Sequence, residues 1–248
     1  MSPIPLYENV ESTLAAGIAD GSLPPETQLP PEESLIDRFK VSRTTVRKAI
    51  QNLIERGLVE IRRGKGTFVT RPKITQELTE LTGFVEDMEA LGRRPSARLL
   101  DKRVVAADET VARHLALPRG TLVFRLQRVR LADDIPMSFD ETYLPHDLGE
   151  KVAGNDLEAE PVFALLEEKY ATPLTEAEYR LEAAAADPVV AAALQVPNGS
   201  PIFLIERTSY TSGSRPVDYE RLHYRGDLIR FVTRLARRPR TSTQAGEV

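Results

Sequence analysis

Residues 41–69 place a basic amphipathic helix directly before a glycine-containing hairpin, an order that few folds accommodate. Apolar side chains recur at helical spacing between residues 43 and 56 and predict one buried helix face: Val46, Ile50, Leu53 and Ile54. Ser42 stands at the N-cap position, so residues 43–47, rich in arginine and threonine, occupy the first two turns. Such a helix end can enter a major groove, where hydroxyl and amide groups meet phosphate and a guanidinium reaches the edge of guanine.

The elements around this helix predict a winged helix-turn-helix domain. Two amphipathic helices, residues 6–18 and 32–39, precede it. Short strands at residues 58–61 and 67–69 flank the turn Arg63-Gly64-Lys65-Gly66. Three helices followed by a two-stranded hairpin form the order of elements that defines this fold.

Positive charge is concentrated on the predicted third helix and hairpin. Residues 40–73 contain ten lysine and arginine residues against two acidic residues, whereas residues 1–39 contain one against seven. The chain as a whole carries a net charge of −4. The overall acidity therefore hides a local cationic surface suited to a polyanion, and the sequence predicts binding to double-stranded DNA.

Composition limits the other kinds of site. The 248 residues suffice for two domains, and the absence of cysteine excludes disulfides and thiolate metal sites. His114, His146 and His223 are scattered without the spacing of metal ligands, so we expect no metal and no cofactor. Without an apolar leader or a stretch long enough to span a bilayer, a cytoplasmic protein with no membrane contact is expected.

Beyond residue 80 the pattern changes to strands mixed with short helices. The predicted strands are residues 97–106, 122–131, 136–144, 174–185, 201–211 and 216–224, and the predicted helices are residues 83–91, 108–115, 161–170 and 187–194. Turn residues at 132–134 and 212–214 favour antiparallel neighbours, which makes the fold class α+β around an antiparallel sheet. The predicted organisation is a DNA-binding domain at 1–71, a polar linker at 72–80, an α+β domain at 81–233 and a disordered tail at 234–248.

Short motifs follow one another in a fixed order over nearly the whole chain. The N-terminal motifs are Leu6-Tyr7-Glu8, Gly21-Ser22-Leu23-Pro24, Val41-Ser42-Arg43-Thr44-Thr45-Val46-Arg47, Gly57-Leu58-Val59 and Gly64-Lys65-Gly66-Thr67-Phe68-Val69. The C-terminal motifs are Gly83-Phe84-Val85-Glu86-Asp87-Met88, Arg128-Val129-Arg130-Leu131-Ala132-Asp133, Glu141-Thr142-Tyr143-Leu144-Pro145 and Tyr224-Arg225-Gly226-Asp227. This set resembles the HutC subfamily of GntR transcription regulators, with a UTRA effector-binding domain. The resemblance implies a homodimer on a short palindromic operator and a chorismate-lyase-like C-terminal domain whose metabolite usually releases the DNA.

The resemblance implies DNA contacts from the third helix and the hairpin: Ser42, Arg43, Thr44, Thr45, Arg47, Lys48, Arg63, Lys65, Gly66 and Thr67. By this analogy Arg43 reads a base, the two threonines contact phosphate or base, and Arg47 lies along the backbone. Lys65 and Gly66 approach the minor groove or its phosphates, the glycine allowing close backbone approach.

One position departs from the family pattern. Members usually carry an arginine after the glutamate of the second helix and a serine before it, and the arginine contacts DNA. Here Glu33 and Pro31 stand at these positions. Because Glu33 would repel phosphate, we expect either that this contact is absent or that the operator differs.

Arg128 and Arg130 are the main candidates for binding a small molecule. They share one face of a predicted strand with apolar residues that begin at Leu122. Two guanidinium groups side by side on an inward face repel each other unless an anion or carboxylates pair with them. The alternative is structural neutralisation by Asp140, Glu141, Glu206 or Glu220. In family members that bind sugar phosphates, the matching arginines hold the anionic group of the ligand.

The resemblance extends this effector site to eight residues: Phe84, Val85, Arg128, Arg130, Asp140, Phe163, Glu220 and Tyr224. The backbone amides of Phe84 and Val85 are expected to face the same anion. Tyr224 matches a tyrosine that closes over the ligand, although a tyrosine at the core edge bonded to a carboxylate fits the sequence equally well. Hydroxyl groups expected of a sugar-phosphate site are replaced at Val85, Pro161 and Phe163, which favours a carboxylate over a differently held sugar phosphate.

These observations predict a metabolite-responsive repressor that a small anion releases from its operator by reorienting two DNA-binding heads. A DNA-tethered enzyme that uses the same anion pocket is the alternative from another class. We expect no enzymatic activity, because the sequence offers no nucleophile with a base, no metal ligand set and no phosphate loop. An architectural DNA-binding protein without an effector would leave the larger domain without a task.

Overall fold

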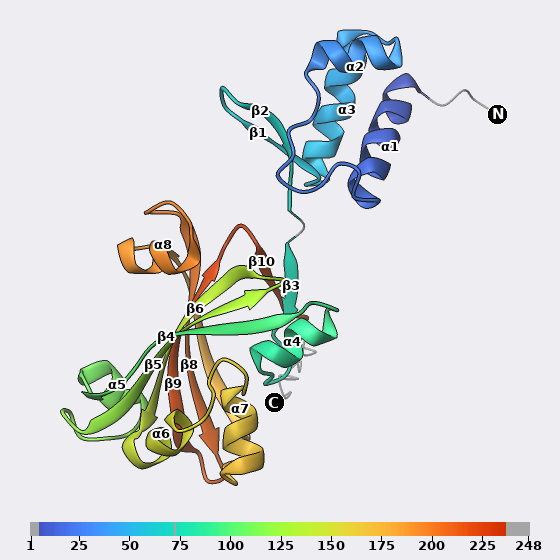
Figure 1. The fold of residues 1–248 in the computed structure, drawn as a ribbon. Coiled ribbons are helices and arrows are strands. Elements are labelled where there is room, and N and C mark those ends of the chain that lie inside the picture. Colours follow the sequence, from blue (N-terminus) through green and yellow to red (C-terminus); the bar gives the residue numbers. More distant parts are fainter. Residues whose placement is uncertain (1–4, 72, 237–248) are drawn as a thin grey trace, which may run out of the picture. The chain divides into compact units, whose positions relative to one another are not determined.

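The computed structural model describes residues 5–71 and 73–236, and the chain divides into two compact units at Ile74 (Figure 1). Each unit has its own hydrophobic core. Within the described ranges no helix is both long and apolar enough to cross a membrane. The two units are described separately below.

The first unit is a winged helix-turn-helix domain, as predicted. Its elements are α1 (Leu6–Ala19), α2 (Glu32–Phe39), α3 (Arg43–Glu55), β1 (Val59–Arg62) and β2 (Gly66–Val69). The two strands pair antiparallel and form the wing. The predicted helices and strands therefore exist within about two residues of their expected ends.

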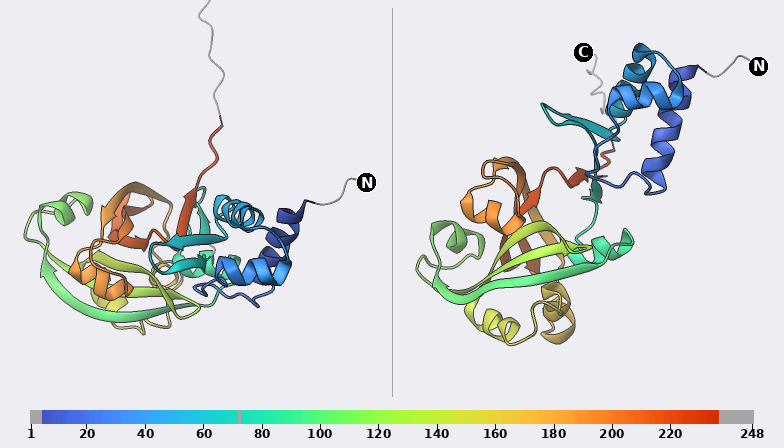
Figure 2. Two further views of the ribbon diagram at one scale, coloured as in Figure 1. Left: turned by 90° about the horizontal axis from the view of Figure 1, so that it is seen from above. Right: turned by 45° about the horizontal axis from the view of Figure 1, so that its top comes forward.

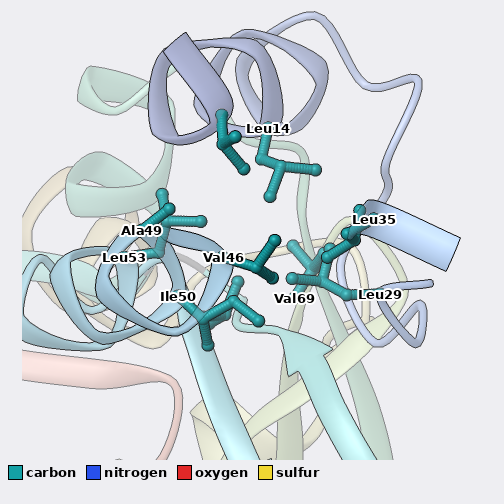
Figure 3. Close-up of a cluster of buried hydrophobic side chains, with 10 residues drawn as sticks. Leu14, Leu29, Leu35, Val46, Ala49, Ile50, Leu53 and Val69 are labelled. Carbon is teal, nitrogen blue, oxygen red and sulfur yellow. The ribbon is translucent and has the colours of Figure 1, made fainter. Parts of the chain in front are cut away.

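The core of the first unit joins all its elements. Figure 3 shows Leu14 of α1, Leu35 of α2 and Val69 of β2 converging on one face of α3. That face carries Val46, Ala49, Ile50 and Leu53, which are buried. Because this stripe is held against the core, the arginine- and threonine-bearing face of α3 is left to solvent.

The second unit is built on a six-stranded antiparallel sheet in the order β4-β5-β6-β9-β8-β7. Its strands are β4 (Pro95–Ala106), β5 (Leu122–Ala132), β6 (Ile135–Pro145), β7 (Glu176–Ala185), β8 (Pro201–Thr211) and β9 (Arg215–Arg225). Its helices are α4 (Phe84–Ala90), α5 (Glu109–His114), α6 (His146–Ala153), α7 (Val162–Ala164) and α8 (Pro188–Leu194). A π-helical turn, η1 (Leu165–Lys169), follows α7.

Helices cover both faces of this sheet (Figure 2). Leu126 of β5 packs into a cluster with α6 and α7, whereas Val123 packs with α5 and Val129 with α8. Successive side chains of a strand point to opposite faces, so α6 and α7 lie on one face and α5 and α8 on the other. Arg128 and Arg130 have the parity of Leu126 and share its face.

The sheet contains an internal repeat that the sequence analysis missed. Each half consists of a strand, a capping aspartate, a short helix and a hairpin, namely β4-α5-β5-β6 and β7-α8-β8-β9. Asp108 caps α5 and Asp187 caps α8 through side-chain bonds to backbone amides. At constant spacing, Asp108, Pro118, Gly120, Phe124 and Arg128 recur as Asp187, Pro197, Gly199, Phe203 and Arg207. At the same spacing, Ala106, Ala107, Val111, Ala112 and Leu115 recur as Ala185, Ala186, Val190, Ala191 and Leu194.

Three segments differ from the prediction. The expected linker 72–80 contains a strand, β3 (Ile74–Glu77), which is hydrogen-bonded to β10 (Ile229–Val232) near the chain's end. Neither strand nor α6 was predicted, because four-residue strands and a short helix give too little periodicity. The helix expected at 161–170 is divided between α7 and η1. The predicted tail lies outside the described residues from residue 237 onward.

Candidate functional site

The N-terminal turn of α3 is fixed by its cap. Ser42 Oγ accepts a hydrogen bond from the Thr45 amide at 3.2 Å and contacts Thr45 Oγ1 at 2.8 Å. Ser42 and Thr45 thus satisfy each other and order the first turn. Arg43 and Thr44, between them, are exposed, as are Arg47 and Lys48 on the following turn. The α3 residues predicted to contact DNA therefore form one solvent-facing surface, with Thr45 half-buried.

Acidic residues of α2 lie against this surface. Arg47 Nε donates to both carboxylate oxygens of Glu32 at 3.0 and 3.1 Å. Arg43 Nη2 lies 3.6 Å from Glu33 Oε1, and both side chains are exposed. The departure at Glu33 thus places a carboxylate beside the arginine predicted to read a base. The sequence predicts repulsion of phosphate by Glu33 but not its ion pair with Arg43.

The wing presents two cationic side chains, Arg63 and Lys65, which are exposed and form no ion pair within the described residues. Gly66 has φ of 120°, and a Cβ there would lie 2.4 Å from Gln28 Nε2. Gln28 Nε2 donates to the carbonyl of Lys65 at 2.8 Å. The positive φ therefore favours glycine at this position independently of any approach to DNA, and a Cβ would also displace the end of the Gln28 side chain. Thr67, inside β2, is half-buried.

A cavity in the second unit brings most of the predicted effector residues together. Its lining comes from the start of α4, from β5, β6, β8 and β9, and from α7, and it has an empty volume of about 700 Å³ including its open mouth. The lining contains six of the eight predicted residues: Phe84, Val85, Arg130, Asp140, Phe163 and Tyr224. Arg128 and Glu220 are not part of the lining and are 0% and 1% exposed. Arg128 is two residues before the lining residue Arg130 on β5, and Glu220 is two residues before the lining residue Leu222 on β9.

Arg130 is neutralised by a carboxylate, as the structural alternative proposed. Its Nε donates to Asp140 Oδ2 at 2.9 Å, and Ser138 Oγ donates to the other oxygen at 2.6 Å. Glu141 instead pairs with Arg221, and Glu206 accepts from Tyr219. Of the four acids considered as partners for the β5 arginines, Asp140 is therefore the one that pairs, and it pairs with Arg130 alone within the described chain.

Arg207 is a cavity residue that the sequence analysis did not identify. Its Nη2 donates to Glu220, its Nη1 donates to the Tyr179 hydroxyl at 3.0 Å, and its Cζ lies 4.5 Å from the ring centre of Phe163. Thr142 Oγ1 also donates to Glu220, at 2.8 Å. Glu220, predicted as an effector ligand, is thus the counter-ion of Arg207. The internal repeat was the signal that could have found Arg207, because it occupies the position of Arg128.

Arg128 is a buried cation without a partner. None of its three side-chain nitrogens has a hydrogen-bond acceptor among the described residues, and its side chain is fully buried. Burial, followed by the nearby charge of Arg130, lowers the pKa of Arg128 to about 9. The guanidinium is still protonated at neutral pH. A buried charge without a hydrogen-bonded counter-ion is costly, which makes this position a candidate for anion binding.

The repeat explains why Arg128 lacks a partner. Arg207 and Glu220 are opposite each other in the β8–β9 register, and Arg128 and Asp140 are opposite each other in the β5–β6 register. In the second half Glu220 pairs with Arg207. In the first half Asp140 bonds to Arg130 instead, whereas the position equivalent to Arg130 is Ser209. Arg130 is therefore paired with Asp140, and Arg128 has no carboxylate partner among the described residues.

The described residues contain no group of three or more histidine or acidic side chains placed to hold a metal ion. His114 bonds to Thr208 and stacks on Tyr219, and His223 bonds to the carbonyl of Phe139. Both histidine side chains therefore contact residues of the sheet.

Comparison with known proteins identifies both units. Residues 6–69 match the gntR family of bacterial regulatory proteins, and residues 90–230 match the UTRA domain. The HTH-type transcriptional repressor NagR of Bacillus subtilis is 35% identical over 231 residues, which cover 93% of this chain and 95% of that protein. The histidine utilization repressor of Pseudomonas putida is 30% identical over 235 residues, covering 95% and 94%.

The fold agrees with these relationships. The crystal structure of PhnF from Mycobacterium smegmatis has a TM-score of 0.68 at 30% identity, and the match covers 92% of this chain and 100% of that one. The two sequence relatives are named as repressors, not as enzymes. The chain belongs to the GntR family and is a transcriptional repressor of the HutC type, with a DNA-binding domain followed by a UTRA effector-binding domain.

Proposed function

We propose that this repressor is a cytoplasmic homodimer that binds a palindromic operator and is released from it by a small anionic effector. In this proposal the exposed face of α3 enters the major groove and the wing contacts the adjacent backbone. The effector occupies the cavity beside Arg130 and Arg207 and supplies the counter-charge of Arg128. Two heads related by a two-fold axis account for a palindromic site.

The observation that carries the effector proposal is the unpaired guanidinium of Arg128. Three arginines, at positions 128, 130 and 207, are buried on β5 and β8, and Arg130 and Arg207 line the cavity. Asp140 and Glu220 neutralise two of them. Within the described residues Arg128 is the one of the three without a hydrogen-bonded carboxylate, and this favours an anionic ligand such as a carboxylate. Val85 and Phe163 on the lining also favour a carboxylate, because their apolar side chains offer no hydroxyl donors.

A thermal-shift screen tests the effector proposal. Ligand that binds the native state raises the melting temperature by mass action. We expect a carboxylate in a panel of carboxylates, phosphonates and sugar phosphates to stabilise the wild-type chain but not Arg128→Gln. Arg125→Gln is the matched control, because Arg125 is on the same strand and is paired with Asp101. A compound that stabilises both variants equally would show that Arg128 is not part of the site.

A binding titration tests the DNA proposal. A duplex selected from a random-sequence library against the full chain provides the operator, and its sequence shows whether the site is palindromic. Arg43→Ala should weaken binding to that duplex by about ten-fold or more, since one good base contact contributes roughly 1–3 kcal/mol. Arg113→Ala, on the exposed end of α5, changes net charge equally and should leave the affinity unchanged. Equal affinity of wild type and Arg43→Ala would refute the assignment of α3 as the reading helix.

A further inference from the structure

The segment that leads from the DNA-binding unit into the effector domain is held as a strand. β3 begins at Ile74, five residues after the wing strand β2 ends at Val69, and is hydrogen-bonded to β10. The Leu78 amide donates to the Val232 carbonyl at 2.9 Å, and Thr233 Oγ1 donates to the Leu78 carbonyl at 3.4 Å. In this two-stranded ribbon, β3 is the segment that continues covalently toward the first unit, and β10 is hydrogen-bonded to it.

A first contact joins this ribbon to the cavity through α4. Gln76 of β3 donates through Nε2 to Asp87 Oδ2, and Thr82 Oγ1 donates to Asp87 Oδ1 at 2.6 Å. Burial raises the pKa of Asp87, so the carboxylate is in a partly desolvated position where a hydrogen bond is strengthened. Asp87 lies in the first turn of α4, and the residues just before it, Gly83 to Glu86, line the cavity.

A second contact joins the ribbon to the cavity through β9. Phe231 of β10 packs edge-on against Tyr224, with ring centres 5.3 Å apart at an interplanar angle of 83°. It also packs edge-on against Phe203 of β8, at 5.5 Å and 78°. Tyr224 is buried and lines the cavity. β3 thus contacts the cavity wall formed by α4, and β10 contacts the wall formed by β9.

From this arrangement we propose that Gln76 and Phe231 are positioning residues that transmit the state of the cavity to the DNA-binding unit. The inference rests on the function proposed above. A ligand that shifts the start of α4 moves Asp87 and pulls Gln76, and one that shifts Tyr224 moves Phe231. Because β3 and β10 are hydrogen-bonded to each other, either displacement reaches Ile74 and the chain that continues into the first unit. Coupling between two sites is reciprocal in binding free energy, so DNA binding acts back on both cavity walls.

Reciprocity allows a test that needs no identified effector. The probe is the DNA duplex selected from a random-sequence library, and the readout is amide hydrogen exchange of the full chain with and without it. In the wild type we expect the duplex to change the amide exchange rate about five-fold or more in peptides covering residues 83–90 and 222–228. A factor of about five is the lower end of the usual range of coupling between two sites. Gln76→Met should abolish the change at 83–90 and keep it at 222–228, and Phe231→Leu should do the reverse.

Controls come from the same two strands. Glu77→Gln and Arg230→Gln alter exposed neighbours of the two residues and should preserve both changes. All four variants should bind the duplex with wild-type affinity, which separates a positioning role from a structural one. If the duplex binds but leaves both cavity peptides unchanged in the wild type, or if both variants keep both changes, the inference is wrong and the proposed function stands. Failure to select any duplex would overturn the proposed function and the inference together.

Discussion

At the scale of single residues, Arg128 and Arg207 show how one neighbour decides the role of a side chain. Both occupy the same position of an internal repeat and both face a carboxylate across the strand pair. Arg207 has its carboxylate, whereas Arg128 has lost Asp140 to Arg130. Arg207 is therefore paired within the fold, whereas Arg128 has no hydrogen-bonded carboxylate among the described residues.

The two arginines should respond oppositely to the same substitution. Arg207→Gln leaves Glu220 buried without its partner and should lower the free energy of unfolding by about 3–5 kcal/mol. Arg128→Gln removes an uncompensated charge and should leave the free energy of unfolding unchanged or raise it. Urea denaturation of the two variants at neutral pH measures both values. Equal destabilisation by the two substitutions would contradict the assignment of Arg128 as unpaired.

Asp218 should make the stability of the effector domain depend on pH. It is fully buried, and burial, together with the charge of Glu220, raises its pKa to about 7, against the lowering effect of Arg207. A carboxyl whose pKa is higher in the folded state binds its proton more tightly there. Its stabilising contribution is therefore complete below about pH 4, the pKa of an unfolded aspartate, and is lost as the pH rises to about 7.

The substitution Asp218→Asn removes this titration. Relative to the wild type, the variant should gain more stability at pH 8 than at pH 5, as measured by urea denaturation at both values. Asp134→Asn, at an exposed turn residue, is the control and should show no such difference. A constant difference between wild type and Asp218→Asn across this range would show that the carboxyl titrates normally.

At the scale of elements, acidic residues of α2 pair with basic residues of α3. The first turn of α2 places Glu32 and Glu33 against Arg47 and Arg43, so the arginines predicted to bind DNA are held by acids in the free protein. In the sheet, an acid of one strand likewise pairs with an arginine of its neighbour: β5 carries Arg128 and Arg130 on one face, and Asp140 of β6 pairs with Arg130. In both places the function of an element depends on its neighbour.

Removal of the Glu33 charge should strengthen DNA binding. Like charges about 4 Å apart in water cost roughly 1 kcal/mol, which corresponds to a change of about five-fold in affinity. Glu33→Gln should therefore bind the selected duplex about five times more tightly at low salt, with a smaller gain at high salt because of screening. Fluorescence anisotropy titration at two salt concentrations measures this, with Glu55→Gln at the far end of α3 as the control. Weaker binding by Glu33→Gln would instead show that Glu33 orients Arg43 for its base.

At the scale of the whole molecule, the chain consists of two units with separate cores, divided at Ile74. Separate cores allow separate unfolding, and the cap of α3 belongs only to the first. Ser42→Ala removes the acceptor of the Thr45 amide and should lower the stability of the first unit by about 1 kcal/mol.

Calorimetry of the full chain should therefore show two transitions. Ser42→Ala should shift only one of them, and Arg207→Gln should shift only the other. Ser12→Ala, on the exposed side of α1, is the control for the first unit. A single transition that both substitutions shift equally would show that the two units unfold cooperatively.

The sequence by itself determined the helices of the DNA-binding unit, the order of the long strands and the family. These features follow from periodicity, capping residues such as Ser42, Asp108 and Asp187, and turns, all of which act over a few residues. The sequence also placed Arg128 and Arg130 on one face of one strand. It could not assign their partners.

Only the tertiary structure decided which charges meet. The pairing of Asp140 with Arg130, the entry of Arg207 into the cavity wall and the joining of β3 to β10 all connect segments that lie far apart along the chain or compete for one partner. Local sequence carries no information about which of two arginines an acid selects, because that choice depends on side-chain geometry across strands. The unpaired guanidinium of Arg128 and the β3–β10 ribbon are therefore properties of the fold.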